Sequence, residues 1–261
     1  MDFGELLNSV PLWLLFILTA AVCLIGVELG TLLAKLSLRV RGKEAEAPLG
    51  SLVGAILGLL AFILAFTFGV TTSRFDTRRQ LVLDEALAVR TTYLRAGLLP
   101  SSQGLEIRRL LREYVEVRLK IGSRNVQQMM TRSEELHRQL WRQAEALIKE
   151  DMDSEIRSLF IASLNDVIQL HENRKIVGLL YRIPGSIWFS LYLLSFLSML
   201  CIGYQAAMAG SRRLLGSVLL AAAFSLVVVM IADVDRPGEG RIRVSQQPIA
   251  DVQQQMLKDS P

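Results

Sequence analysis

Few residues in this chain can do chemistry, and the most unusual of them is a carboxylate inside an apolar run. Glu28 lies near the far end of the apolar stretch 11–33, between Gly26 and Gly30. A carboxylate within a membrane-spanning helix is costly unless it faces a partner or water, which makes Glu28 a candidate ion or proton site. The alternative is a structural carboxylate that pairs with a nearby base such as Lys35 or reaches the membrane surface.

Asp233, Asp235 and Arg236 form a second polar group, directly after the last apolar run. Carboxylates at the C-terminal end of a helix oppose the helix macrodipole and therefore need partners. One interpretation is an ion pair with Arg236 or another arginine that locks the C-terminal tail in place. A calcium site is the alternative, although two carboxylates are few beside the roughly 6–8 oxygen ligands that calcium prefers. We expect no other cofactor.

Sulfur and imidazole ligands are scarce. Cys23 and Cys201 both fall inside apolar runs, so neither is placed for a disulfide framework or a metal site. The two histidines, His137 and His171, stand far apart on charged helical sequence, which argues against zinc. No local signature of serine or cysteine catalysis is present. The sequence therefore predicts neither a metal centre nor an enzyme.

Four long apolar runs must position these residues, in a chain that is 51% hydrophobic and only 21% charged. Each run reaches the roughly 20 residues that a helix needs to cross about 30 Å of hydrocarbon. A backbone in lipid must satisfy its own hydrogen bonds, so the spans are helical. The sequence predicts an all-α integral membrane protein and excludes a disulfide scaffold, a disordered chain and a plain soluble enzyme. The four runs are 11–33, 49–72, 187–208 and 214–232.

The second run carries a stripe of small residues on one helical face, opposite a bulky face. Such a stripe lets another backbone approach closely, so tight packing against a neighbouring helix is one interpretation. We call it the small-residue stripe, and its members are Gly50, Gly54, Gly58, Ala61, Ala65 and Gly69.

A helix that lines a symmetric pore is the other interpretation of this run. Phe62 and Phe66 flank the stripe one turn apart and, with Ile63, would form an apolar constriction that gates by dewetting. Pattern alone does not separate the two interpretations. The candidate pore-lining residues are Gly54, Gly58, Phe62, Ile63, Ala65 and Phe66.

Residues 74–182 are predicted to form a helical extramembrane domain between the second and third spans. The second span should run on as one helix towards Leu99, since no proline and no glycine before Gly97 interrupts it. Three further helices are expected, one from about 105 to 121, one after a cap at Thr131 or Ser133 and reaching about 149, and one from 153 or 154 to about 181. The charges of this domain are interleaved in sign, which is typical of solvated helical faces and not of a nucleic-acid patch.

The domain division follows from these elements. Residues 1–73 form the first transmembrane pair, 183–234 the second pair and 235–261 the C-terminal tail. Within the tail, Ile249, Val252 and Met256 recur at helical spacing and predict a short amphipathic helix.

Loop charges predict an orientation, because basic residues near span ends favour the cytoplasm. Two short loops on one side are basic and place both termini and the central domain on the extracytoplasmic side. Four arginines near span ends on the opposite side, Arg74, Arg78, Arg79 and Arg182, argue for the reverse. The first run lacks the basic start of a secretory signal and should stay as an anchor. The basic loop residues are Lys35, Arg39, Arg41 and Lys43, and Arg212 and Arg213.

Several motifs together resemble one family. They are Glu28 late in the first span, residues 54–62 (GAILGLLAF), 91–96 (TTYLRA), and the tail 235–248 with its DRP and VSQQP segments. Over nearly its whole length the chain resembles the bestrophin-like domain family of bacterial membrane proteins.

The resemblance implies a function. Bestrophins are pentameric anion channels with four spans per subunit, a second span that lines the pore with an apolar neck, and acidic residues after the fourth span that form a calcium clasp. By position, the neck would lie near Phe62, Ile63 and Phe66, and the clasp near Asp233 and Asp235. The resemblance thus implies a homo-oligomer in the inner membrane that conducts inorganic anions, with a cytosolic helical domain. The alternative is a non-conducting membrane protein whose helical domain binds a partner or senses the state of the cell envelope.

Overall fold

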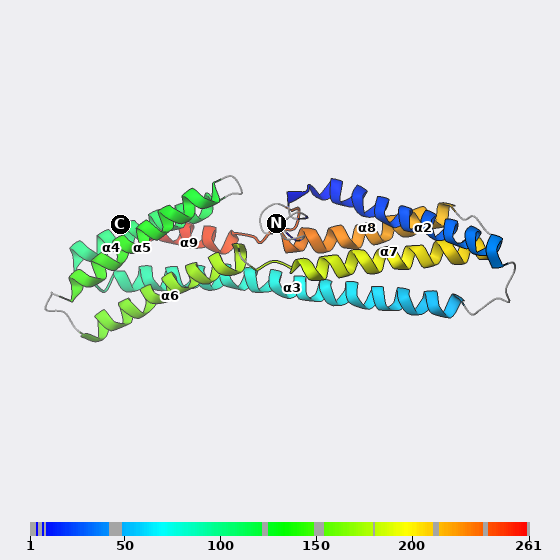
Figure 1. The fold of residues 1–261 in the computed structure, drawn as a ribbon. Helices are drawn as coiled ribbons and strands as arrows, with labels where there is room; N and C mark the ends of the chain where they lie inside the picture. The colour runs from blue at the N-terminus through cyan, green and yellow to red at the C-terminus, as the bar shows by residue number, and fades with distance from the viewer. Residues whose placement is uncertain are drawn as a thin grey trace. The chain divides into compact units, whose positions relative to one another are not determined.

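The computed structural model of the chain describes residues 4, 7, 9–41, 49–121, 125–148, 154–179, 181–210, 214–236 and 240–259. Every regular element in these ranges is an α-helix (Figure 1). This confirms the predicted all-α class, while the extramembrane placement of the central domain stays a prediction. The helices are α2 (Leu12–Arg41), α3 (Leu49–Ala96), α4 (Ser101–Leu119), α5 (Val126–Leu147), α6 (Ser154–Leu179), α7 (Gly185–Met208), α8 (Leu214–Asp235) and α9 (Gln247–Lys258).

Four helices are long and apolar enough to cross a membrane, and they contain the four predicted runs except for Pro11, which precedes α2. The qualifying stretches are Leu12–Arg39, Gly50–Ala96, Gly185–Met208 and Leu215–Asp235. In α3 no charged residue precedes Arg74, and the helix continues without a break to Ala96, as the sequence predicts. The chain is therefore a multi-pass membrane protein by the length and composition of its helices.

Helix boundaries follow local chemistry. Pro100 and Pro184 are the N-cap residues of α4 and α7, where the missing proline N–H costs no helical hydrogen bond. The helix α7 ends at Met208, and Gly210 just beyond it takes the left-handed conformation with a φ of 67°. Glycine adopts that conformation without a steric penalty, which is why it stops helices.

Two predicted helix starts are wrong. The helix α4 begins at Ser101 and not near Leu105. The helix α5 begins at Val126, so Thr131 and Ser133 lie inside it and do not cap it. Their hydroxyls donate to the carbonyls of Gln127 and Met129, four residues earlier, which is how serine and threonine fit within a helix. The predicted helix boundaries at Lys149 and Asp153, and the loop bases Lys43, Arg212 and Arg213, lie outside the described residues.

The chain divides into two compact units, and α3 contributes to both. Unit 1 comprises Met1–Ser73, Arg182–Arg236 and Gly240–Ile242, and unit 2 comprises Arg74–Tyr181, Pro237–Glu239 and Arg243–Pro261. Each unit has its own apolar core.

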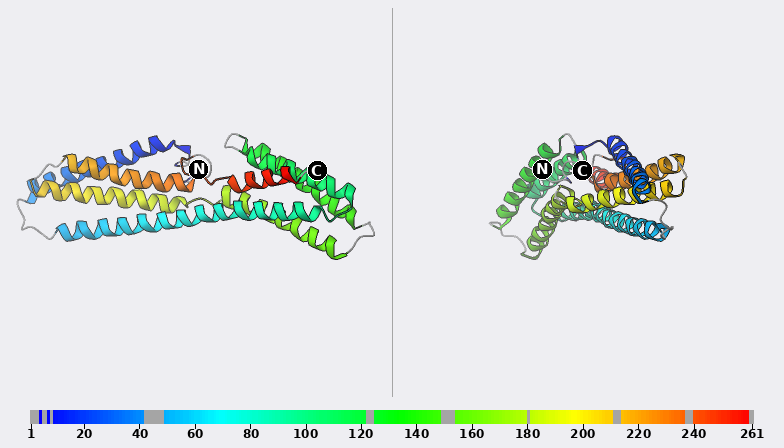
Figure 2. Two further views of the ribbon diagram at one scale, coloured as in Figure 1. Left: turned by 180° about the vertical axis from the view of Figure 1, so that it is seen from behind. Right: turned by 45° about the vertical axis from the view of Figure 1, so that its right-hand side comes forward.

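In unit 1, α2 packs against α7 and α8 (Figure 2). The contact between α2 and α7 is made by glycines whose backbones touch. A Cβ added at Gly30 would lie 2.0 Å from the carbonyl oxygen of Leu200, and one added at Gly203 would lie 2.0 Å from that of Val27. Only glycine allows this approach, so the Gly26-x-x-x-Gly30 spacing is a helix-packing motif in this fold.

Unit 2 is built from the second half of α3 together with α4, α5, α6 and α9. The predicted amphipathic tail helix is confirmed as α9, which buries Ile249, Val252 and Met256 in the core. The Tyr93 hydroxyl of α3 also donates to the carbonyl oxygen of Met256 at 3.3 Å. The C-terminal segment is therefore part of the core of unit 2.

Candidate functional site

The small-residue stripe lies on the exposed face of α3. A Cβ added at Gly54, Gly58 or Gly69 would meet no described atom within 4 Å. The opposite face of the same stretch, with Leu60 and Leu64, is buried in the core of unit 1. Among the described residues, no helix of the same chain packs closely against Gly54, Gly58 or Gly69, whereas a Cβ added at Gly50 would lie 3.4 Å from Gln205 Nε2 of α7.

The two phenylalanines beside the stripe are also exposed. Phe62 is 65% exposed and Phe66 is 60% exposed, one helical turn apart, and Ala65 is exposed between them. Ile63 differs, because it is half-buried and packs against the core of unit 1. In a single chain, two large aromatic rings and most of the small-residue stripe therefore share a face without cover from described residues.

Glu28 lies on the exposed side of α2. The Thr31 hydroxyl donates to the Glu28 backbone carbonyl at 2.7 Å and approaches the carboxylate at 3.5 Å. No ion pair joins Glu28 to Lys35 in the described part of the chain. The carboxylate is thus presented outwards from unit 1, and an ion or proton role for it stays a prediction.

Asp233, Asp235 and Arg236 are all buried at the end of α8 and serve as hydrogen-bonding partners within unit 1. The backbone N–H of Arg241 donates to Asp233 at 2.7 Å, and that of Ile183 donates to Asp235 at 3.2 Å. These donors supply the partners that carboxylates at a helix C-terminus need.

The Arg236 guanidinium donates to the backbone carbonyls of Leu7 and Val10. The Asp233–Asp235–Arg236 group therefore ties the end of α8 to the segment before α7 and to the N-terminal segment. A calcium role for these carboxylates stays a prediction.

A group of buried polar side chains in unit 2 was not predicted as a site. We call it the buried polar cluster, and it joins four helices: α3, α4, α5 and α6. At its centre the Glu85 side chain is 0% exposed, and its Oε1 lies 3.0 Å from Arg118 Nε. Its members are Glu85, Tyr114, Arg118, His137, His171 and Arg174.

Glu85 is the shared acceptor of this cluster. Arg118 donates through Nη2 to Oε2 at 3.2 Å, Arg174 donates to the same oxygen, and the Tyr114 hydroxyl donates to Oε1. Arg174 also donates through Nη2 to the Gln246 side chain at 3.0 Å, just before α9. One carboxylate therefore holds α3, α4, α6 and the C-terminal segment together.

The charges in the cluster are fixed at neutral pH. Burial alone would raise the pKa of Glu85, but Arg118 and Arg174 outweigh burial and lower that pKa to about 2. Burial, reinforced by the Glu85 carboxylate, raises the pKa of Tyr114 well above its ordinary value. Glu85 is thus ionised. The Tyr114 hydroxyl stays protonated and donates a hydrogen bond to the Glu85 carboxylate.

This arrangement also fixes the tautomer of His171. Its Nδ1 lies 3.2 Å from the Tyr114 hydroxyl oxygen. Because the only Tyr114 hydroxyl proton goes to Glu85, that oxygen must accept, so the His171 Nδ1 carries the proton. The His171 Nε2 therefore presents a bare lone pair.

The two histidines that stand far apart in the sequence lie side by side in the structure. Their ring centroids are 4.7 Å apart, edge to face. Burial lowers the pKa of His137 to about 4, and burial together with Arg118 lowers the pKa of His171 to about 3. Both rings are neutral at physiological pH.

Acid should therefore weaken unit 2. Each histidine has an ordinary pKa of 6.5 that is depressed in the folded state, so between pH 6.5 and the folded value the unfolded chain binds more protons. The stabilisation is complete above about pH 6.5 and is lost as the pH falls. At pH 5 we expect a loss of roughly 2 kcal/mol per histidine. Thermal unfolding of the full chain in detergent with EDTA, from pH 7.5 to 5, measures it, and a flat profile for unit 2 would contradict it.

The cluster was missed for a physical reason, although one signal was present. Its members are distant in sequence and meet only when four helices pack. However, Glu85 falls on the apolar face of its helix with Val82 and Val89, and His171 follows Leu164 and Val167 in the same way. A charged or titratable side chain on a buried helical face requires a partner, and this could have identified the cluster.

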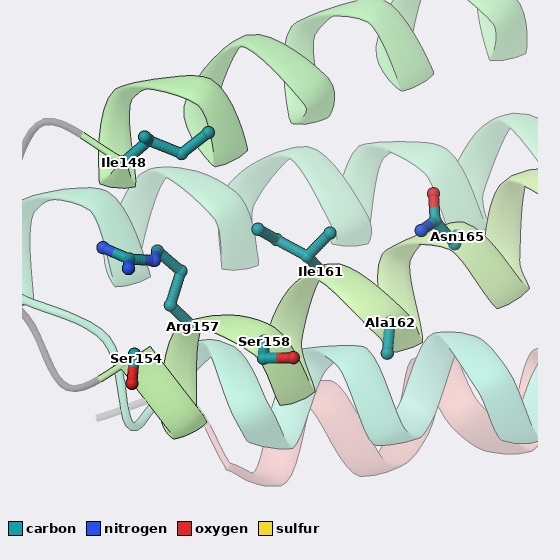
Figure 3. A pocket seen from close by; sticks show the side chains of 7 residues that line it. All are labelled: Ile148, Ser154, Arg157, Ser158, Ile161, Ala162 and Asn165. Carbon is teal, nitrogen blue, oxygen red and sulfur yellow. The ribbon is translucent and has the colours of Figure 1, made fainter.

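Unit 2 also has a surface pocket of about 540 Å³ between the end of α5 and the first half of α6 (Figure 3). Among the described lining residues, Arg157 is the one charged side chain, and the aliphatic side chains Ile148, Ile161 and Ala162 contribute apolar surface. The remaining lining residues are Ser154, Ser158 and Asn165.

Comparison with known proteins supports the fold. The family model of the bestrophin-like domain matches residues 17–249. The fold is similar to crystal structures of a bacterial bestrophin homologue from Klebsiella pneumoniae. A single-substitution variant is 13% identical with a TM-score of 0.65, covering 95% of this chain and 100% of that one. A structure phased with zinc is 14% identical with a TM-score of 0.64, covering 95% and 98%. No curated protein sequence matches the chain.

Proposed function

This chain belongs to the bestrophin-like domain family, and we propose that it forms a homo-oligomeric anion channel in which α3 lines the pore. The observation that carries the proposal is the exposed face of α3. Glycine and alanine leave room for copies of α3 to gather around an axis. Phe62 and Phe66, both mostly exposed, then narrow the path as an apolar constriction.

The preference for anions and the pentameric state rest on the resemblance to bestrophins. The inner membrane as location rests on the same resemblance. For orientation, loop charge favours external termini and an external helical domain, whereas the resemblance favours a cytosolic domain. Labelling of single cysteines in unit 2 with a membrane-impermeant reagent, in intact cells and in lysed cells, separates the two orientations.

The channel proposal predicts that Phe66→Ala changes conduction. Removing the ring widens and wets an apolar constriction, so chloride flux should rise several-fold. Purified protein in liposomes with a chloride-sensitive dye measures the flux, and planar bilayers measure single-channel currents. The matched control is Phe189→Ala, which removes an exposed phenylalanine from α7. Flux equal to that of empty liposomes, equal effects of the two substitutions, or a monomeric particle would each refute the proposal.

One observation favours a second function, a non-conducting protein whose helical domain binds a partner or senses the envelope. The helix α3 runs unbroken for 48 residues, from the apolar stretch into unit 2, so it can transmit strain. Partner recovery in pull-downs from cells should then depend on residues 105–180. Full recovery without that region would exclude this function.

A further inference from the structure

Two carboxylates and an imidazole converge between α5 and α6 in unit 2. One ligand atom each from Glu134, His171 and Glu172 lies within 4.8 Å of the other two. Glu134 comes from α5, and the other two residues come from α6. Both carboxylates are partly exposed, whereas the His171 side chain is fully buried. Acidic residues that lie together do not by themselves make a metal site. Whether this group can bind a metal ion therefore depends on the His171 imidazole.

The His171 Nε2 is an acceptor with no partner in the described part of the chain. The Tyr114–Glu85 relay keeps the ring proton on Nδ1, and the buried Nε2 has no hydrogen-bond partner among the described residues. A buried lone pair left unsatisfied is unfavourable unless something binds it. Metal-ligating histidines commonly have this arrangement, in which the second ring nitrogen donates to an outer-shell group that fixes the ring. The His137 ring packs edge-on against His171 and further restricts it.

A cation already occupies the space between the carboxylates. The Lys175 ammonium lies 2.6 Å from Glu134 Oε1 and 3.8 Å from Glu172 Oε2. The two carboxylates therefore attract positive charge at this point, and Lys175 neutralises them from within the protein. A divalent ion that bound here would displace the ammonium, which can move because its side chain is long and partly exposed.

We propose that Glu134, His171 and Glu172 bind a divalent transition-metal ion, with Zn²⁺ as the best match and Lys175 as its internal competitor. One imidazole nitrogen and two carboxylate oxygens, with water as a fourth ligand, suit zinc. Calcium is disfavoured because it takes oxygen ligands only. Tetrahedral zinc ligands lie about 3.3 Å from one another, so the distances between the three ligand atoms, now within 4.8 Å, shorten by up to about 1.5 Å on binding.

The site has a structural consequence. The ion joins α5 to α6 directly, and through His171 it is coupled to Tyr114 and the buried polar cluster. Zinc should therefore raise the melting temperature of unit 2, because a ligand that binds the folded state only stabilises it. This inference revises the expectation from the sequence, in which distance between the histidines argued against zinc. It does not depend on channel activity.

The test uses the full chain, purified in detergent without a histidine tag and stripped with EDTA. Calorimetric titration should give one Zn²⁺ per chain, and Co²⁺ should give visible absorption bands that report coordination by the protein. We expect Glu134→Gln and Glu172→Gln each to weaken Zn²⁺ binding at least tenfold. Lys175→Met should strengthen it at least threefold, because the competing ammonium is gone.

The matched control is Glu135→Gln. Glu135 follows Glu134 in the sequence, but its carboxylate pairs with Arg132, and the substitution neutralises it. It should leave Zn²⁺ affinity unchanged. Circular dichroism and gel filtration establish that each variant is folded, and the gain in Lys175→Met cannot arise from unfolding. The proposal is overturned if no saturable Zn²⁺ binding occurs, if the two glutamine variants bind as wild type does, or if Lys175→Met binds more weakly.

Discussion

Replacing Glu85 by glutamine is expected to destabilise unit 2 by about 3–5 kcal/mol, because it leaves two buried guanidinium groups without a carboxylate. Arg118 is almost fully buried, and Arg174 is nearly so. Glutamine has nearly the same shape as glutamate, so the substitution opens no cavity; it removes the charge and replaces one acceptor oxygen by an NH2 donor. The loss of unfolding free energy should therefore report the cost of leaving the two arginines without a carboxylate, and not a change in packing.

Denaturant unfolding of the full chain, with hydrogen exchange read on peptides from α4 and α6, measures this effect in unit 2. The matched control is Asp84→Asn, which neutralises the neighbouring half-buried carboxylate that accepts from Gln80. The control should cost no more than about 0.5 kcal/mol, as is usual for surface substitutions.

A double variant provides a second test of the Glu85 prediction, through partial recovery of stability. Adding Arg174→Met to Glu85→Gln removes one of the two uncompensated charges and should recover part of the stability. Equal losses for Glu85→Gln and Asp84→Asn, or no recovery in the double variant, would show that the Glu85 carboxylate is not what holds these helices.

The elements of this protein are more predictable than its contacts. The four spans and the continuation of α3 past Arg74 depend on the length and composition of single segments, which are local properties. The start of α5 was missed because threonine and serine can cap a helix or bond within it, and only the neighbouring turns decide between the two. The small-residue spacing of Gly26 and Gly30 was visible, but nothing in the sequence identifies Gly203 as its partner.

The candidate sites show the same contrast between predictable local features and unpredicted tertiary contacts. The exposure of Phe62 and Phe66 agrees with the face assigned from helical periodicity, although a pore along that face stays a prediction. The buried polar cluster depends on the meeting of Glu85 with Arg118 and His171, which only tertiary packing brings about. Sequence analysis that treats each helix as a solvated surface therefore does not predict that these charged side chains are buried and paired.

Adding a single methyl group at Gly30 is expected to destabilise unit 1 by roughly 3 kcal/mol, the upper range for overpacking. The new Cβ would lie 2.0 Å from the Leu200 carbonyl oxygen and 2.8 Å from the Tyr204 nitrogen. Both are backbone atoms, so no side chain can move aside and α2 must separate from α7. Thermal unfolding and the monodisperse fraction after purification of Gly30→Ala measure the loss.

Gly54→Ala is the matched substitution, because it adds the same methyl group to a span where no described atom lies within 4 Å. In a single chain it should be neutral or stabilise by up to about 1 kcal/mol, since alanine favours helix over glycine. Wild-type stability in Gly30→Ala would contradict the close contact between α2 and α7. A loss in Gly54→Ala that appears only in the oligomer would mean that a second copy approaches α3 at the small-residue stripe, because nothing described within the chain can meet that methyl group.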